Sequence, residues 1–186
     1  KSLPDFLSLS LAGSKVVIGD GPMLLGLQSR FPDAHFLGAV EHQNLPAYYR
    51  AADVVLIPSR SESFGLVALE SAACGIPVVA SAVGGLLTLV EHGHTGYLVE
   101  SRDPNEYAAW VDSILADPVL ARRLSVSAAA MARDYTWSTS AARLRRIYED
   151  LSQVPLTPCN EPSIDIDLLS LATDGADDRR SERHEA

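Results

Sequence analysis

The chain has 186 residues, a hydrophobic content of 47% and a formal net charge of −9. This size suits one domain with a substantial core, and the acidic balance argues against nucleic acid as a partner. Its two cysteines form neither a disulfide framework nor a metal-ligand spacing, and no signal peptide or apolar run of the roughly 18 residues needed to span a membrane is present. We therefore expect a cytoplasmic domain that uses no metal.

Short apolar strands alternate with helices over the first hundred residues. A short helix is expected within residues 1–11, and strands at residues 14–19, 34–40, 54–58, 76–81 and 97–99. Between the strands, helices are expected at residues 23–31, 45–52, 64–73 and 86–91. This alternation indicates the α/β class, with a Rossmann-like parallel sheet flanked by helices.

The chain from Pro104 onward is expected to be helical. Asp103 can cap a helix ending near residue 116, and Asp117 precedes Pro118 at the start of another that ends near residue 134. Thr136 or Ser138 can cap a last helix that ends near residue 151. Its apolar residues fall on one stripe that we expect to pack against the domain, namely Trp137, Leu144, Ile147, Tyr148 and Leu151.

Residues 152–186 differ in composition from the rest. They contain three prolines, no aromatic residue and an excess of acidic side chains, so we expect a disordered acidic tail. The sequence thus divides into a domain at residues 1–151 and a tail at residues 152–186.

Two glutamates flank the start of the helix expected at residues 64–73. Glu62 lies in the preceding loop, and Glu70 is the only charge in a long run of Ala, Val, Leu and Gly. A rise of about 1.5 Å per residue places the two carboxylates on the order of 10 Å apart, which spans a diphosphate with a hydroxyl-bearing group at each end. A purely local alternative is that Glu62 favours the helix dipole beside a Ser61 or Ser63 cap, while Glu70 is solvated.

Glycine-containing turns follow several of the expected strands. Gly19 and Gly21 follow the first strand, and Gly84 and Gly85 follow the fourth. In an open parallel sheet these turns lie with Glu62 beyond the carboxyl ends of the strands, where ligands bind and helix N-termini attract anions. A turn like that at Gly19 and Gly21 is more often plain turn chemistry than a phosphate loop, whereas the turn at Gly84 and Gly85 is as compatible with a tight turn as with ligand binding. Together with the two glutamates they indicate a crevice for a phosphorylated, hydroxyl-rich ligand.

The order and spacing of these motifs over residues 1–151 resemble those of the retaining glycosyltransferases of family 4, also called group 1. The matching segments are Gly19-Asp20-Gly21-Pro22, Phe36-Leu37-Gly38, Ala51-Ala52-Asp53 followed by Pro58-Ser59, the Glu62 and Glu70 pair around Phe64-Gly65, and Gly75-Ile76-Pro77-Val78-Val79-Ala80 followed by Gly84-Gly85. The resemblance implies the fold of the C-terminal half of a GT-B enzyme, which binds the nucleotide sugar.

The resemblance also implies roles for particular residues. Glu62, the candidate catalytic residue, would contact hydroxyls of the transferred sugar and stabilise it, and Glu70 would contact the ribose hydroxyls. Backbone amides of Phe64, Gly65 and Leu66 would face sugar and diphosphate. The other donor-binding positions are Lys1 at the diphosphate, Gly38 to Val40 at the base, and Gly19, Gly21, Gly84 and Gly85 along the crevice. The family generally works without a bound metal, and no cofactor is implied.

The family pattern includes parts that would precede Lys1. They are an arginine five residues before Lys1, a first strand between the strands at Val16 and Val54, and an N-terminal domain that binds the acceptor. Such a gap would leave two strand edges unpaired, which is a recognised aggregation liability. The acceptor, a lipid, an inositol or a glycan, is not specified by the residues present. Association with the inner face of a membrane would depend on the N-terminal part.

Three functions stay open from the sequence. The first is the donor-binding part of a retaining glycosyltransferase that uses a UDP-sugar or GDP-mannose. The second is a catalytically incomplete module from a truncated or split gene, which binds a nucleotide or a partner chain. The third is an enzyme related to the UDP-sugar epimerases, which the motifs match only loosely.

Overall fold

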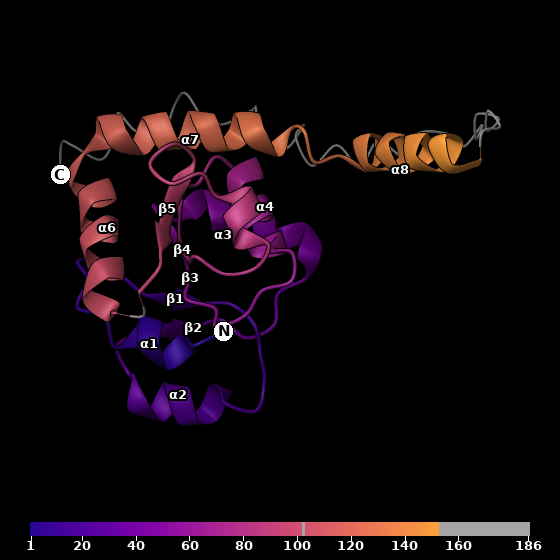
Figure 1. Ribbon diagram of the computed structural model, residues 1–186. Coiled ribbons are helices and arrows are strands. Elements are labelled where there is room, and N and C mark those ends of the chain that lie inside the picture. The colour runs from indigo at the N-terminus through magenta and orange to yellow at the C-terminus, as the bar shows by residue number, and fades with distance from the viewer. Residues whose placement is uncertain (102, 153–186) are drawn as a thin grey trace.

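The computed structural model describes residues 1–101 and 103–152 as an α/β domain with a projecting C-terminal helix (Figure 1). Its strands are β1 (Val16–Val17), β2 (His35–Phe36), β3 (Val55–Ile57), β4 (Val78–Ser81) and β5 (Gly96–Val99). Its helices are α1 (Leu3–Leu7), α2 (Leu24–Arg30), α3 (Leu45–Ala51), α4 (Leu66–Ala73), α5 (Leu86–Leu89), α6 (Pro104–Ala116), α7 (Pro118–Ala132) and α8 (Trp137–Ser152), with a 3₁₀ turn at His42–Asn44. Each expected helix and strand is present, although most strands are shorter than the sequence suggested.

The strands form two parallel sheets, ordered β1-β2 and β3-β4-β5. In the larger sheet Leu56 pairs with Val79, which pairs in turn with Tyr97. Within the described residues β1 and β3 are not paired, which agrees with the interruption expected between the strands at Val16 and Val54. The α/β class with parallel sheets and flanking helices, predicted from the sequence, is confirmed.

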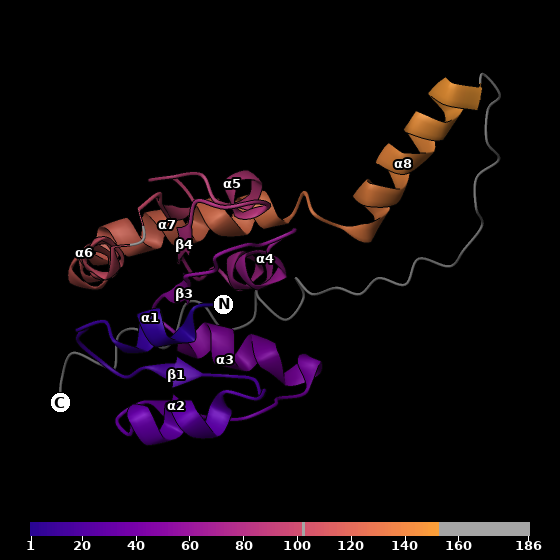
Figure 2. The same cartoon turned by 60° about the horizontal axis from the view of Figure 1, so that its bottom comes forward.

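The core surrounds β4, whose residues are all buried. Side chains alternate across a strand, so Val79 faces one layer and Val78 and Ala80 face the other. The Val79 side is covered mainly by α6 and the first half of α7, and the opposite side by α4 and α5. Helix α7 also packs along α4 through the small residues Ala72, Ala128 and Ala132. The smaller sheet has its own hydrophobic cluster with α1 and α2, which lie near β1 in Figure 2.

The predicted caps of the C-terminal helices are confirmed. Asp103 accepts a hydrogen bond from the backbone amide of Asn105 (2.9 Å), and Asp117 accepts one from that of Leu120 (3.0 Å). Thr136, one of the two residues expected to cap α8, accepts from the backbone amide of Thr139 at 3.0 Å. These caps satisfy amides that a helix leaves unpaired at its first turn.

The predicted start of α4 was wrong by two residues. The helix begins at Leu66 rather than near Phe64, and its cap is Gly65, with a φ of 98° and no side-chain hydrogen bond. A left-handed backbone is favourable mainly for glycine, so the serine caps considered at positions 61 and 63 are not used.

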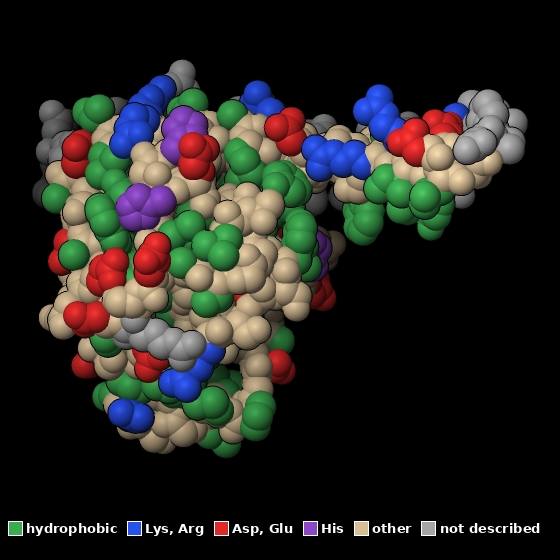
Figure 3. Space-filling model, viewed as in Figure 1, with side chains coloured by type: hydrophobic (Ala, Val, Ile, Leu, Met, Phe, Trp, Pro, Cys, Tyr) green, Lys and Arg blue, Asp and Glu red, His purple; other side chains and the backbone are tan. Residues whose placement is uncertain are grey.

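Helix α8 does not pack as the sequence suggested. None of its residues is buried, and the side chain of Trp137 is 82% exposed. Hydrophobic side chains lie along one side of α8 and charged ones along the other, as Figure 3 shows. The helix leads away from the body in both ribbon views, so no described residue covers its apolar side (Figures 1 and 2).

The tail expected at residues 152–186 lies outside the described residues except for Ser152, which ends α8. Among the described helices, none combines the length and the hydropathy required to cross a bilayer.

Candidate nucleotide-sugar site

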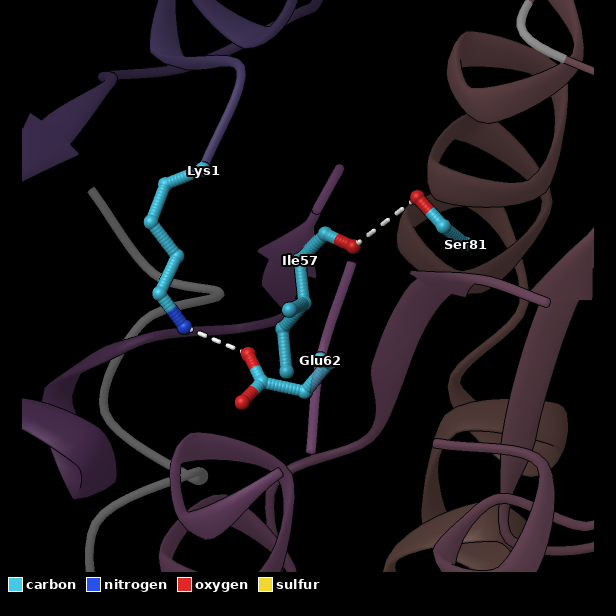
Figure 4. A network of polar contacts seen from close by, with 4 residues as sticks. All are labelled: Lys1, Ile57, Glu62 and Ser81. Atoms are coloured by element: carbon cyan, nitrogen blue, oxygen red, sulfur yellow. Dashed lines mark hydrogen bonds and ion pairs between the residues drawn. The ribbon is translucent and has the colours of Figure 1, made fainter. Parts of the chain in front are cut away.

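The candidate site lies at the carboxyl ends of β3 and β4. Because these strands are parallel, the loop after β3 carrying Glu62 and the turn after β4 carrying Gly84 and Gly85 emerge at the same edge. The hydroxyl of Ser81, the last residue of β4, donates to the carbonyl oxygen of Ile57 at 3.4 Å, which ties the two strand ends together (Figure 4). The same hydroxyl lies 2.7 Å from that of Tyr107 on α6.

The glycine turn supports the backbone of the glutamate loop. The amide of Gly85 donates to the carbonyl oxygen of Glu62 at 3.1 Å. A Cβ atom on Gly84 would lie 1.8 Å from the same oxygen, and one on Gly85 would lie 2.2 Å from the carbonyl oxygen of Phe64. No side chain fits at these separations. The two glycines are therefore required by close backbone contact, rather than only by turn geometry.

Lys1 and Glu62 form an ion pair at this edge of the sheet (Figure 4). The Nζ atom of Lys1 donates to Oε2 of Glu62 at 2.5 Å. The lysine side chain is 59% exposed and that of Glu62 only 17%, so the carboxylate lies deeper than the ammonium group. Lys1 holds the pKa of Glu62 below its ordinary value, because the donated hydrogen bond favours the charged carboxylate. Glu62 is accordingly an anion and a hydrogen-bond acceptor at neutral pH.

The N-terminus of α4 presents unpaired amides beside this ion pair. In the described part of the chain, the backbone amides of Phe64, Gly65 and Leu66 donate no hydrogen bond. The dipole of α4 adds partial positive charge at this end, which favours an anion such as a phosphate. The side chains of Phe64 and Leu66 are exposed, and the Phe64 ring meets that of Tyr135 edge to face at 6.3 Å.

Glu70 lies one turn further along α4 and is half-buried. Its Oε2 atom accepts a hydrogen bond from the hydroxyl of Tyr49 on α3 at 2.8 Å. The local alternative of a solvated Glu70 therefore does not hold. Sequence reasoning missed Tyr49, because α3 and α4 meet only through the tertiary fold. The only sequence feature that could have pointed to it is the pair of adjacent tyrosines at positions 48 and 49.

The remaining predicted donor-binding residues lie on the smaller sheet. Gly19, after β1, donates through its amide to the carbonyl oxygen of Gly38, after β2, at 2.7 Å. A Cβ atom at Gly19, Gly21 or Gly38 would meet nothing within 4 Å, so these glycines are open toward the surface. Val40 follows in the same loop. No hydrogen bond or ion pair among the described residues joins this group to Glu62 or Glu70.

Among residues 1–101 and 103–152, no group of three or more His, Cys, Asp or Glu side chains is arranged to hold a metal ion. At the larger sheet, the Lys1 ammonium group, the carboxylates of Glu62 and Glu70 and the amides at the start of α4 are among the groups that a ligand can meet.

Solved structures similar to this chain include glycosyltransferases. Sucrose-phosphate synthase from Thermosynechococcus elongatus superposes with a TM-score of 0.67 at 36% identity, over 74% of this chain and 38% of that one. Anabaena HepE, solved in complex with UDP-glucose, gives a TM-score of 0.65 at 26% identity, over 82% of this chain and 44% of that one. The fold is thus that of a C-terminal domain of the GT-B glycosyltransferase class.

The sequence comparison agrees with the structural one. The model of the family described as "Glycosyl transferases group 1" matches residues 16–131, and the chain belongs to this family. Among curated relatives, the D-inositol 3-phosphate glycosyltransferase of Thermobispora bispora (strain ATCC 19993) is 50% identical over 106 residues. The match covers 57% of this chain and 25% of that enzyme, so the chain spans about a quarter of the length of the relative.

Proposed function

We propose that the chain is the donor-binding domain of a retaining, family 4 glycosyltransferase that takes a UDP-sugar. The observation that carries this proposal is the ion pair of Lys1 and Glu62 beside the unpaired amides of α4. A nucleoside-diphosphate sugar offers a dianionic diphosphate to the ammonium group and the amides, and sugar hydroxyls to the carboxylate.

In the bound state, the diphosphate takes the Lys1 ammonium group from Glu62 or shares it. The freed or shared carboxylate accepts hydrogen bonds from the transferred sugar, and its negative charge stabilises the positive charge that develops on the sugar as the diphosphate leaves. The α4 amides and Lys1 offset the charge that accumulates on the leaving diphosphate. Glu70 accepts hydrogen bonds from the ribose hydroxyls, which anchors the opposite end of the donor.

The base is assigned to the smaller sheet. Gly19 and Gly38 bring their backbones together at 2.7 Å, and the open space at these glycines allows a flat ring to approach the chain from Gly38 to Val40. We propose UDP rather than GDP as the nucleotide of the donor, because HepE, which is 26% identical to this chain, was solved with UDP and with UDP-glucose.

The acceptor is proposed to be an inositol phosphate. Relatives of 39–50% identity are named D-inositol 3-phosphate glycosyltransferases. The described residues suggest no site of their own for it, so the acceptor is expected to bind to a part of the enzyme outside them. The cytoplasm stays our proposed location, because the two cysteines give no disulfide framework.

Isothermal titration tests donor binding. The complete gene product and its Glu70→Ala and Glu62→Gln variants are each titrated with UDP, UDP-glucose and GDP-mannose. UDP binding that weakens in Glu70→Ala supports the proposal, whereas equal UDP affinity in the wild type and Glu70→Ala removes the role of Glu70. Preference for GDP-mannose would contradict the choice of nucleotide.

Product stereochemistry tests the reaction. The enzyme is incubated with D-inositol 3-phosphate and each nucleotide sugar, and the anomeric proton coupling of the product is read by NMR. An α-linked product from an α-linked donor supports retention, and a β-linked product contradicts it. An epimerised nucleotide sugar formed without acceptor would favour the epimerase alternative instead.

A further inference from the structure

The hydrogen bond between Tyr49 and Glu70 joins two helices at the candidate ribose site. The Tyr49 hydroxyl donates to Oε2 of Glu70 at 2.8 Å, and both residues are half-buried. The two residues are 21 positions apart, so the contact depends on the packing of α3 against α4.

Tyr49 acts only as a donor in this pair. Burial raises the pKa of its hydroxyl far above the ordinary value, and the hydrogen bond to Glu70 raises it further. The hydroxyl therefore stays protonated over the whole neutral range, and its proton is directed at the carboxylate.

The pair leaves acceptor capacity on Glu70. A carboxylate offers about four lone-pair sites, and within residues 1–101 and 103–152 Tyr49 is the only group that donates to this one. The side chain of Glu70 has three rotatable torsions, and one strong hydrogen bond on Oε2 restricts them. Oε1 is thereby kept in place to accept from another group.

We propose that Tyr49 is a positioning residue for ribose recognition, fixing the Glu70 carboxylate so that its second oxygen accepts hydrogen bonds from the ribose hydroxyls. This inference rests on the proposed function, since it takes Glu70 to be the ribose-binding carboxylate. Without the tyrosine, Glu70 would have to be ordered at the moment of binding, which lowers affinity. The effect would be confined to ligands that carry the hydroxyls.

The test compares UDP with 2′,3′-dideoxy-UDP, which lacks both ribose hydroxyls. Dissociation constants are measured by isothermal titration for the wild type, Tyr49→Phe, Glu70→Ala and the double variant. The control is Tyr48→Phe, which removes the neighbouring hydroxyl from a residue that is 39% exposed and makes no hydrogen bond in the described chain.

We expect Tyr49→Phe to weaken UDP binding about fivefold or more, as for other hydrogen bonds to charged groups. Binding of 2′,3′-dideoxy-UDP should change less than about twofold, and Tyr48→Phe should change neither constant. In the Glu70→Ala background the Tyr49 substitution should have no further effect on UDP affinity. This dependence on Glu70 distinguishes a positioning residue from one that only stabilises the fold.

Two kinds of failure are separable. A wild type that binds UDP no better than 2′,3′-dideoxy-UDP overturns the proposed role of Glu70 itself. A wild type that discriminates, combined with Tyr49→Phe that discriminates equally well, overturns the role of Tyr49 alone. Equal losses for both ligands in Tyr49→Phe would mean a structural effect and also contradict the proposal.

A measurement on the wild type keeps the proposal testable if Tyr49→Phe does not fold. The ¹³Cζ resonance of Tyr49 is followed during titration. It should shift on addition of UDP and not on addition of the dideoxy analogue, and an identical shift with both ligands would contradict the inference.

Discussion

Gly84 lies so close to the carbonyl oxygen of Glu62 that no side chain fits at position 84. A Cβ atom on Gly84 would lie 1.8 Å from the carbonyl oxygen of Glu62, far inside van der Waals contact. The turn after β4 thus limits where the carboxylate after β3 can lie.

Gly84→Ala should destabilise the domain and weaken UDP binding. The φ of 51° at Gly84 alone costs a non-glycine residue about 1–3 kcal/mol, and the clash with Glu62 adds to this cost. Urea unfolding and isothermal titration measure the two effects. The matched control is Gly26→Ala in α2, where the added Cβ meets nothing within 4 Å and alanine should raise the free energy of unfolding by about 0.4–1 kcal/mol. A Gly84→Ala variant as stable as the wild type would show that the loop moves freely.

Lys1→Met should raise the pKa of Glu62 toward its ordinary value. A carboxyl group with a lowered pKa in the folded state stabilises the fold above its ordinary pKa and loses that contribution as the pH falls. The wild type should therefore lose more of its free energy of unfolding than Lys1→Met between about pH 5 and 3. NMR titration of the Glu62 carboxyl carbon checks the pKa directly. Arg122→Met, an exposed change of the same charge on α7, should leave that titration unaltered.

Tyr49→Phe should lower stability at neutral pH by about 1–2 kcal/mol, because it removes a hydrogen bond to a charged group. A group whose pKa is raised on folding contributes stability that is complete below its unfolded value of 10.0 and is lost as the pH rises toward the folded value. The difference between the wild type and Tyr49→Phe should therefore narrow above about pH 10. Urea unfolding from pH 7 to 11 measures it, and a difference independent of pH would contradict the assignment.

Substitutions on the apolar side of α8 should leave the free energy of unfolding of the domain nearly unchanged. Leu144 and Ile147 are more than half exposed, so Leu144→Gln and Ile147→Gln should each cost less than about 0.5 kcal/mol. Leu124 on α7 is 0% exposed, and Leu124→Ala should cost about 2–5 kcal/mol. Urea unfolding distinguishes the two classes. Large losses from the α8 variants would show that this helix packs against the domain in solution.

The sequence predicted well wherever a local rule decides the structure. The caps at Asp103, Asp117 and Thr136 follow from the short polar side chain that precedes each helix, and the α/β alternation follows from the spacing of the apolar runs. The start of α4 could not be predicted by the same rule, because two serines compete locally with Gly65 and the backbone conformation decides.

Contacts between segments that are distant in the sequence were harder to predict. The ion pair of Lys1 with Glu62 joins residues 61 positions apart, and only the family resemblance placed Lys1 near the donor site. Nothing in the sequence paired Tyr49 with Glu70, since the pairing arises where α3 packs on α4. The apolar stripe of α8 was recognised correctly, but its periodicity says nothing about which surface covers it.

Hydrogen exchange of the Gly85 amide, which donates to the carbonyl oxygen of Glu62, can also report on motion of the glutamate loop. Exchange of that amide proton with deuterated solvent requires the glutamate loop to separate from the turn after β4, so its rate measures how often the loop opens. A donor analogue that holds the loop in place would slow this exchange in proportion to its occupancy, whatever sugar it carries.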